Sequence, residues 1–187
     1  TIWIAGIINA INWMDGADGL AIGLLIIASI AFFIIELPNN LYLSCILASL
    51  IGAALAFLKF NYHPAQIIMG DSGSYFLGFN LAIVSFISSA DNSNPFDLKV
   101  VFLIMFIPIT DMVYVIFRRC ISGKTPFYPD KTHIHHRLLA IGFTERQTVM
   151  VIFSFSILLS SVVLYLEKIL SPIFIFYALI FHCIINC

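Results

Sequence analysis

Most side chains that could do chemistry in this chain belong to three short motifs separated by apolar segments. The first motif holds Asn9, Asn12, Asp15 and Asp18, which recur every three residues. If a helix continued through them, they would share one broad face near its end. Amide and carboxylate oxygens are ligands that Mg²⁺ accepts, often together with substrate phosphates. The motif therefore predicts a magnesium site, with a capped helix end in headgroup water as the alternative.

The second motif surrounds Asp71, which stands between Gly70 and Gly73 just before an expected apolar helix. Ser72 or Ser74 is expected to cap that helix, and the backbone N–H groups of its first turn favour an anion. An acidic residue at a helix start is also simply stabilising, so an ordinary helix cap is the alternative. If Asp71 lies on the same side of a membrane as the first motif, a shared site is favoured.

The third motif is a basic segment in which His133, His135, His136 and Arg137 follow Asp130. The spacing of the histidines lacks the partner cysteines or the helical H-E-x-x-H pattern of common zinc sites, which argues against zinc. Histidine and arginine in a polar loop are more typical of phosphate binding, where arginine forms paired hydrogen bonds. A merely solvated basic loop is the alternative.

Three further charged residues lie at or near one apolar segment. Asp111 falls inside residues 98–117, and an acidic residue at membrane depth usually faces the interior of a helix bundle. It is expected to be either a helix-packing partner or a residue of the site. The pair Arg118 and Arg119 ends this segment and is expected to anchor the helix at the headgroups.

The composition indicates a polytopic membrane protein. Of the 187 residues, 61% are hydrophobic and 10% are charged, whereas soluble domains carry about 25% charged residues. No basic stripe is present, which argues against nucleic-acid binding. We expect an all-α transmembrane helix bundle of six to seven membrane segments, drawn from residues 1–13, 20–37, 41–60, 74–89, 98–117, 148–166 and 172–185. The first is shorter than the about 20 residues that cross a membrane and is expected to end a longer helix.

The expected spans form one membrane domain over residues 1–187, with loops 13–19, 60–73 and 118–147 on one side. Counting spans places all three motifs on that side, together with seven of the nine basic residues. The other side holds two, Lys99 and Lys168. Because loops rich in lysine and arginine stay in the cytoplasm, the motifs are expected to face the cytoplasm.

At these motifs the chain resembles the polyprenyl-phosphate N-acetylhexosamine-1-phosphate transferase superfamily, of the glycosyltransferase family 4 type. The segment from His133 to Leu138 is closer to the undecaprenyl-phosphate GlcNAc-1-phosphate transferase branch than to the peptidoglycan branch. The resemblance implies an enzyme of the bacterial inner membrane that starts cell-envelope polysaccharide synthesis. It would transfer a sugar 1-phosphate, by default GlcNAc-1-phosphate, from a UDP-sugar to undecaprenyl phosphate and release UMP. By analogy it would use Mg²⁺, or alternatively Mn²⁺, and form a homodimer.

The resemblance also implies roles by motif position. Asn12 and Asp71 would bind the metal, and Asp15, Asp18 and Asp71 would be catalytic. Seven residues would bind substrate: Asn9, Asn61, Asp130, His133, His135, His136 and Arg137.

One departure from the family concerns an adjacent Asp-Asp pair, which the family carries in an earlier cytoplasmic loop. This chain contains no such pair, and it resembles the C-terminal part of a larger helical fold. An inactive, truncated membrane fragment is therefore the alternative to an active transferase. A transporter using Asp111 as an ion site is disfavoured, because paired interrupted helices in two halves are missing.

Overall fold

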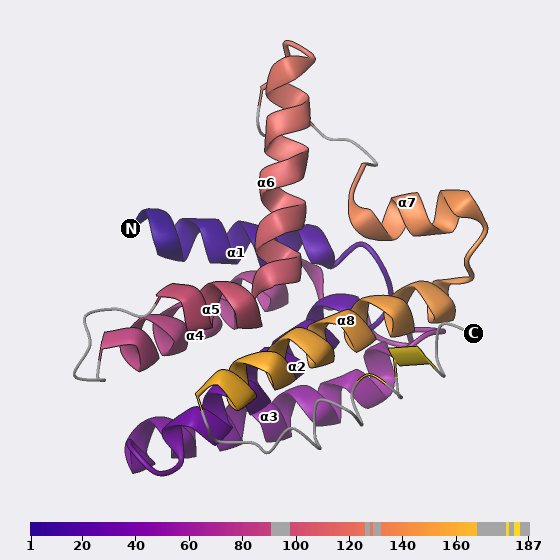
Figure 1. The fold of residues 1–187 in the computed structure, drawn as a ribbon. Coiled ribbons are helices and arrows are strands. Elements are labelled where there is room, and N and C mark those ends of the chain that lie inside the picture. The colour runs from indigo at the N-terminus through magenta and orange to yellow at the C-terminus, as the bar shows by residue number, and fades with distance from the viewer. Residues whose placement is uncertain (91–97, 126–127, 129–131, 168–178, 180–181, 184–187) are drawn as a thin grey trace.

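The apolar segments fold as helices. The computed structural model describes residues 1–90, 98–125, 128, 132–167, 179 and 182–183. Within these residues every regular element is an α-helix, as predicted (Figure 1). The expected helix over 172–185 and the expected loop after Ala90 fall largely outside the described residues. The helices are α1 (Ile2–Met14), α2 (Leu20–Glu36), α3 (Leu41–Asn61), α4 (Gly70–Ala90), α5 (Leu98–Ile104), α6 (Phe106–Ile121), α7 (Ile134–Ile141) and α8 (Glu145–Leu166).

Two of these helices, α3 and α8, are long and apolar enough to cross a membrane. They contain 21 and 22 residues, and a rise of 1.5 Å per residue makes each about 30 Å long, the thickness of the hydrocarbon core. Helices α1 and α2 are apolar but shorter. Large apolar side chains on α3, among them Leu41, Tyr42 and Leu55, are exposed, as expected of a helix that faces lipid. The chain is an all-α membrane bundle.

Close packing of α1 on α4 brings the first two motifs together. A Cβ atom added to Gly78 of α4 would lie 2.9 Å from the Cα of Ile8 in α1, so the absence of a side chain permits this approach. Similarly, Gly23 of α2 accommodates the ring of Phe153 in α8. The buried core continues through α2, which packs against both α3 and α8.

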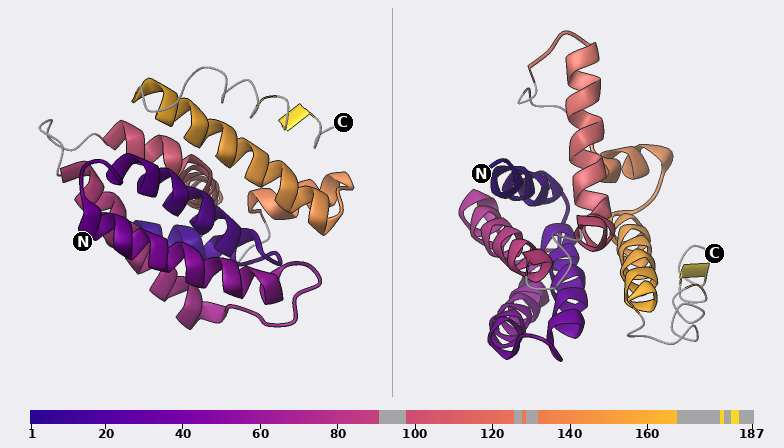
Figure 2. Two further views of the ribbon diagram at one scale, coloured as in Figure 1. Left: turned by 90° about the horizontal axis from the view of Figure 1, so that it is seen from below. Right: turned by 60° about the vertical axis from the view of Figure 1, so that its left-hand side comes forward.

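The segments that carry the motifs gather at one end of the bundle. Helices α1 and α3 end there, and α2, α4 and α8 begin there (Figures 1 and 2). A bond between the turn after α1 and the end of α3, from Gly19 N–H to Asn61 Oδ1 at 3.2 Å, ties two of these segments together. The placement of the motifs on one side of a membrane stays a prediction.

The expected single helix over 98–117 is wrong, because the chain forms two helices there. Helix α5 ends at Ile104, Met105 adopts φ −99° and ψ 20°, and α6 begins at Phe106. Pro108 explains the break, because it lacks an N–H group and its ring would collide with the carbonyl of Ile104 four residues earlier. Helix α6 leaves the bundle at a steep angle (Figures 1 and 2). The break redirects Asp111 and Arg119 toward α7 and α1.

The expected loop over 118–147 contains helical structure. The last turn of α6 reaches Ile121, and α7 spans Ile134–Ile141 before Gly142, whose φ of +110° favours glycine. Thr144 then caps α8 by accepting a hydrogen bond from the backbone N–H of Gln147, while the Gln147 side chain accepts from the Thr144 N–H. Three residues therefore join α7 to α8.

Candidate active site

Asn12 and Asp71 are distant in sequence but bonded to each other in the structure. The Asn12 amide nitrogen donates to Asp71 Oδ1 at 3.1 Å and to Ser74 Oγ at 2.8 Å. Ser74 Oγ donates in turn to the Asp71 carbonyl at 3.1 Å. Because the nitrogen makes these bonds, the amide oxygen of Asn12 is left as a ligand. The structure thus brings together the two residues predicted to bind magnesium.

The start of α4 differs from the prediction. Asp71 lies in the first turn of α4 instead of before it, and Ser72 and Ser74 lie inside the helix. The expectation that one of these serines caps the helix is therefore wrong. Gly70 explains the difference, because its φ of +66° lets the chain turn into the helix one residue before Asp71.

Asp15 directly follows α1 and completes the acidic cluster, which we define as Asn12, Asp15 and Asp71. Burial raises the pKa of Asp15 from 3.8 to about 6, against the N–H of Gly70, which lowers it. The charges of Asp71 and Asp18 raise it further. A divalent cation would relieve this repulsion and stabilise the charged carboxylate. Two carboxylates and an amide oxygen fit a hard cation such as Mg²⁺.

The expected common face of the first motif is divided, because α1 ends at Met14. Asn9 lies one turn before Asn12, and its amide donates to the Ala5 carbonyl of its own helix at 2.7 Å. Asp18 lies beyond the helix, where its Oδ2 accepts from the backbone N–H of Ala65 at 2.9 Å. Asn12 and Asp15 therefore adjoin Asp71, whereas Asp18 faces the loop after α3.

Asn61 is buried at the end of α3 and holds two loops together. Its Oδ1 accepts from Gly19 N–H, and its Nδ2 donates to the Ile67 carbonyl at 2.9 Å. Gly19 adopts φ +77°, a conformation that favours glycine. These bonds fix the loops that flank the acidic cluster. The predicted contact of Asn61 with substrate stays a prediction.

Asp111 joins α6 to the third motif, so it is a helix-packing partner, and its role in a site stays a prediction. Its Oδ2 lies 2.7 Å from His133 Nδ1, and its Oδ1 accepts from the backbone N–H of Ile134 at 2.7 Å. His133 is the residue that precedes α7, so Asp111 caps this helix from α6. Both side chains are buried. We call α7 together with His133 the histidine helix.

His135 lies against the turn that carries Asp15 and Asp18. It is 1% exposed, and within the described part of the chain neither ring nitrogen has a hydrogen-bond partner. A Cβ atom on Gly16 would overlap His135 Nε2, so the glycine lets the ring approach. Burial, followed by the charges of His136 and His133, lowers the pKa of His135 to about 4 against the opposing effect of Asp111. A neutral imidazole therefore faces the turn at neutral pH.

Arg119 and Trp13 pack beside the site, although neither was predicted as a site residue. The Arg119 guanidinium lies 4.8 Å from the centre of the Trp13 ring, and that ring meets His133 edge-on at 5.7 Å. Arg119 is 4% exposed, so the expectation of a headgroup anchor is wrong for it. Stacking on an aromatic ring stabilises a buried guanidinium. A tryptophan in the middle of a polar motif was the signal that it packs on a partner.

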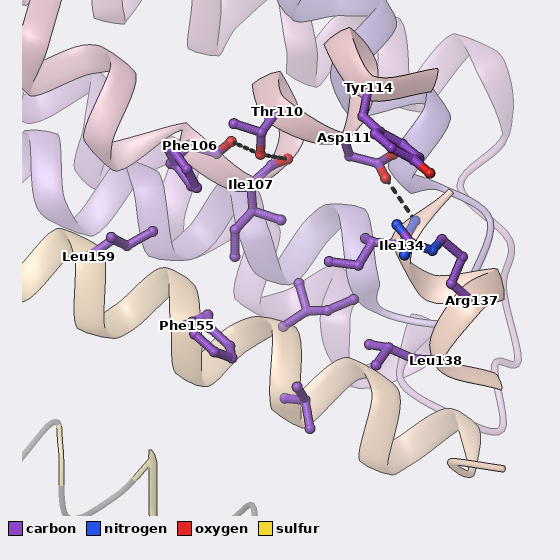
Figure 3. A pocket seen from close by; sticks show the side chains of 12 residues that line it. Phe106, Ile107, Thr110, Asp111, Tyr114, Ile134, Arg137, Leu138, Phe155 and Leu159 are labelled. Carbon is purple, nitrogen blue, oxygen red and sulfur yellow. Dashed lines mark hydrogen bonds between the residues drawn. The ribbon is translucent and has the colours of Figure 1, made fainter. Parts of the chain in front are cut away.

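An apolar groove runs from the histidine helix between α6 and α8 (Figure 3). It encloses about 390 Å³. Asp111 and Arg137 lie toward one end of it in Figure 3. The exposed Arg137 stacks its guanidinium 5.1 Å from the centre of the Tyr114 ring. The apolar lining includes Phe106, Ile107, Leu138, Ile152, Phe155 and Leu159.

Of the remaining predicted residues, His136 lies within the described structure and Asp130 does not. The ring of His136 lies 4.2 Å from that of His135, so it belongs to the same helix turn. Asp130 lies outside the described residues, and its role stays a prediction. His63 and Glu145 were not predicted as site residues, yet both approach Asp18. Their 82-residue separation in sequence gave no local signal of this.

The chain is similar to known proteins along most of its length. Residues 1–89 match the model of glycosyl transferase family 4. The chain is 40% identical over 183 residues to a probable undecaprenyl-phosphate N-acetylglucosaminyl 1-phosphate transferase of Bacillus subtilis, covering 96% of this chain and 51% of the relative. It is 39% identical over 167 residues to a decaprenyl-phosphate N-acetylglucosaminephosphotransferase of Mycobacterium tuberculosis, covering 79% and 41%.

A third relative is more distant. The undecaprenyl-phosphate alpha-N-acetylglucosaminyl 1-phosphate transferase of Escherichia coli K12 is 32% identical over 166 residues, covering 86% of this chain and 45% of the relative. The chain thus spans about half the length of the curated relatives that it matches. All three relatives are named as transferases.

Proposed function

Because the chain belongs to glycosyl transferase family 4, we propose that its motifs form the site where a sugar 1-phosphate passes from a UDP-sugar to a polyprenyl phosphate. One observation carries this proposal. His135 of the histidine helix packs on Gly16, in the turn that begins at Asp15 of the acidic cluster. An oxygen-rich cation site and a segment of histidines and arginine thereby meet at one turn, as a diphosphate with its metal requires.

The acidic cluster is proposed to hold the metal ion. Asn12 and Asp71 would be ligands, and Asp15 would bind directly or through water. When bound, Mg²⁺ neutralises charge on the diphosphate. The close packing of α1 on α4 sets the separation of these side chains, so the ligands are in place before substrate arrives.

The proposed step exchanges one phosphate partner for another. An oxygen of the lipid phosphate attacks the β-phosphorus of the UDP-sugar, and the bond from that phosphorus to the bridging oxygen breaks. UMP leaves with that oxygen, and the sugar 1-phosphate becomes part of a lipid diphosphate. His136 and the exposed Arg137 are proposed to bind the diphosphate oxygens, since arginine pairs well with phosphate. The buried, neutral His135 would hold the histidine helix against the turn without adding charge.

The acceptor is proposed to lie in the apolar groove between α6 and α8. Its walls are apolar side chains such as Phe155 and Leu159, while Arg137 stands at the end near the histidine helix. An isoprenoid chain would bury apolar surface along these walls, and its phosphate would meet Arg137. The relatives' names, which include undecaprenyl and decaprenyl phosphate, support an acceptor of this class.

The donor is proposed from the names of the relatives, and the orientation in the membrane is proposed from the distribution of basic residues. The names of the relatives support an N-acetylglucosamine donor, so UDP-GlcNAc is the proposed donor. The excess of basic residues on the side of the motifs supports a site that faces the cytoplasm.

The test is a transfer assay with membranes that contain the complete protein carrying this chain. UDP-GlcNAc with a radioactive label in its β-phosphate is mixed with undecaprenyl phosphate and Mg²⁺. The proposal requires label in the lipid and release of UMP, both abolished by EDTA. A label that stays in released UDP would mean that the sugar moves without its phosphate. That result, or no labelled lipid from correctly inserted protein, would contradict the proposal.

A further inference from the structure

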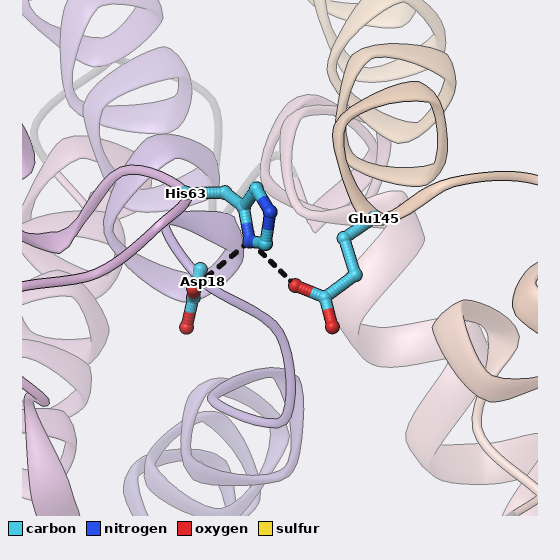
Figure 4. Close-up of side chains that lie close together, drawn as sticks. All are labelled: Asp18, His63 and Glu145. Atoms are coloured by element: carbon cyan, nitrogen blue, oxygen red, sulfur yellow. Dashed lines mark hydrogen bonds and ion pairs between the residues drawn. The ribbon is translucent and has the colours of Figure 1, made fainter.

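A second cluster of metal-ligating side chains lies beside the acidic cluster and shares none of its three residues. It joins Asp18 in the turn before α2, His63 in the loop after α3, and Glu145 at the start of α8 (Figure 4). His63 Nδ1 lies 3.1 Å from Asp18 Oδ2 and 2.7 Å from Glu145 Oε2. One ligand atom from each residue lies within 4.8 Å of the other two.

A hydrogen bond from His63 Nδ1 satisfies the two neighbouring carboxylates poorly. A ring nitrogen carries at most one proton, so a single N–H would have to be shared between two carboxylate oxygens and would be poorly aligned with each. If the nitrogen is unprotonated, its lone pair faces two negative groups. A cation between the three atoms would accept electron pairs from all of them and would neutralise both carboxylates.

We propose that Asp18, His63 and Glu145 form a site for a divalent transition-metal ion of the zinc class. One imidazole nitrogen and two carboxylate oxygens suit such an ion, whereas Mg²⁺ prefers oxygen ligands and water. The side chains of Asp18, His63 and Glu145 are 34%, 34% and 46% exposed, so an ion can enter from solvent and keep a water ligand. The N–H of Ala65 donates to Asp18 Oδ2 at 2.9 Å and orients the carboxylate.

An ion at this site would fasten three segments that frame the acidic cluster. Glu145 begins α8, and α7 ends only a few residues earlier at Ile141. Fixing Glu145 to Asp18 therefore limits movement of the histidine helix over the turn on which His135 packs. This effect on transfer rests on the proposed function, whereas binding of the ion does not.

The experiment measures ion binding to the complete protein, purified in detergent with excess Mg²⁺ to saturate the acidic cluster. Calorimetric titration with Zn²⁺ is expected to show one site per chain that is lost in His63→Gln. Removing the carboxylate ligand in Glu145→Gln is expected to weaken Zn²⁺ binding by roughly 10- to 100-fold or more. Glu167→Gln, the same change just beyond the other end of α8, is the matched control and is expected to bind Zn²⁺ as the unmodified protein does.

A further variant separates a metal site from a simple ion pair. His63→Cys replaces imidazole by a thiolate, which still binds zinc-class ions but cannot bridge two carboxylates as a cation. Co²⁺ added to His63→Cys is expected to give a sulfur-to-cobalt absorption band that Glu145→Gln weakens. The exposed thiols of Cys45, Cys120 and Cys183 are present in every variant, so differences between variants report the proposed site.

Equal Zn²⁺ affinity in His63→Gln, Glu145→Gln and Glu167→Gln would overturn the proposal and leave an ion pair only. Matching melting temperatures without Zn²⁺ would exclude misfolding as the cause of any difference. Asp71→Asn separates this proposal from the transferase, because Asp71 is not a ligand here. That variant is expected to keep full Zn²⁺ binding whatever the transfer assay shows.

Discussion

The acidic cluster and the histidine helix adjoin the same turn, but the chain positions them in different ways. Asn12 and Asp71 stand on α1 and α4, which pack closely along their lengths, and they bond directly to each other. The histidine helix has only eight residues in α7, too few to be stable alone. It is held from outside by Asp111. The proposed metal site is thus formed by helices of the bundle, whereas the segment proposed to bind phosphate packs against the bundle from outside.

The largest expected effect comes from removing a proposed metal ligand from the acidic cluster. Asp71→Asn keeps the volume and the place in α4 but removes a charged ligand. We expect transfer to fall by roughly 100- to 1,000-fold or more, in line with the loss of a preorganised electrostatic contact. The measurement is the initial rate of lipid labelling in membranes, with protein amount determined separately. Glu167→Gln serves as the control, and retained activity in Asp71→Asn would remove Asp71 from the metal site.

The second-largest effect on transfer is expected from weakening the bond that holds the histidine helix to α6. Asp111→Asn removes the charge that His133 meets, although one oxygen remains to accept from Ile134 N–H. A buried charge-assisted hydrogen bond contributes about 1.5–3 kcal/mol, so we expect transfer to fall roughly 10- to 150-fold. Limited proteolysis should cut the segment around α7 faster while α1 and α4 stay protected. Glu167→Gln, just beyond the far end of α8, is again the control.

Equal protection of α7 in Asp111→Asn and in the unmodified protein would contradict this comparison. In that case the histidine helix would be held by its apolar contacts, and Asp111 would have a different role.

A smaller effect is expected from pushing the two regions apart. In Gly16→Ala the new methyl group overlaps His135 Nε2, and overpacking of this kind typically costs about 1–3 kcal/mol. We expect a loss of transfer of roughly tenfold, expressed mainly in the Michaelis constant for the UDP-sugar. Gly52→Ala is the matched control, because a Cβ atom there meets nothing within 4 Å. Unchanged kinetics in Gly16→Ala would show that the contact between His135 and the turn has no part in catalysis.

The smallest expected effect is a change in transfer rate with pH. It distinguishes the acidic cluster from the histidine helix, because Asp15 and His135 have different pKa values. The pKa of Asp15 is raised to about 6, so its carboxylate gains a proton as pH falls through that value and binds a cation less well. When Mg²⁺ is sub-saturating, half of the metal-free sites are protonated at a pH equal to the pKa, so transfer should drop about twofold there. Asp15→Asn should abolish this inflection in the pH profile. Because the pKa of His135 is lowered to about 4, His135→Asn should leave it in place.

Several features could be predicted from local sequence. The apolar segments indicated helices, and Thr144 with Gln147 is a recognisable capping box. The three motifs indicated the residues of the acidic cluster and the histidine helix. Membership of glycosyl transferase family 4 followed from the same residues and agrees with the comparisons. Pro108 was a visible warning that residues 98–117 do not form one helix.

Other features were decided by contacts between distant residues. Sequence reasoning left Asp111 between two roles, because only the break before α6 and the position of α7 place it against His133. Arg119 was expected at the headgroups, but packing of α6 beside α1 buries it on Trp13. No sequence pattern relates Glu145 to Asp18, yet both lie close to His63 in the structure.

The sequence by itself determined the class of the protein, most of its long helices and which residue types its motifs carry, because hydrophobic length, glycine and proline positions, and side-chain type act locally. The tertiary structure decided which polar side chains are partners and which are buried. Those outcomes depend on helix directions and close approaches, such as that of Gly78 to Ile8, to which residues from several segments contribute together. A pattern within one segment cannot contain that information.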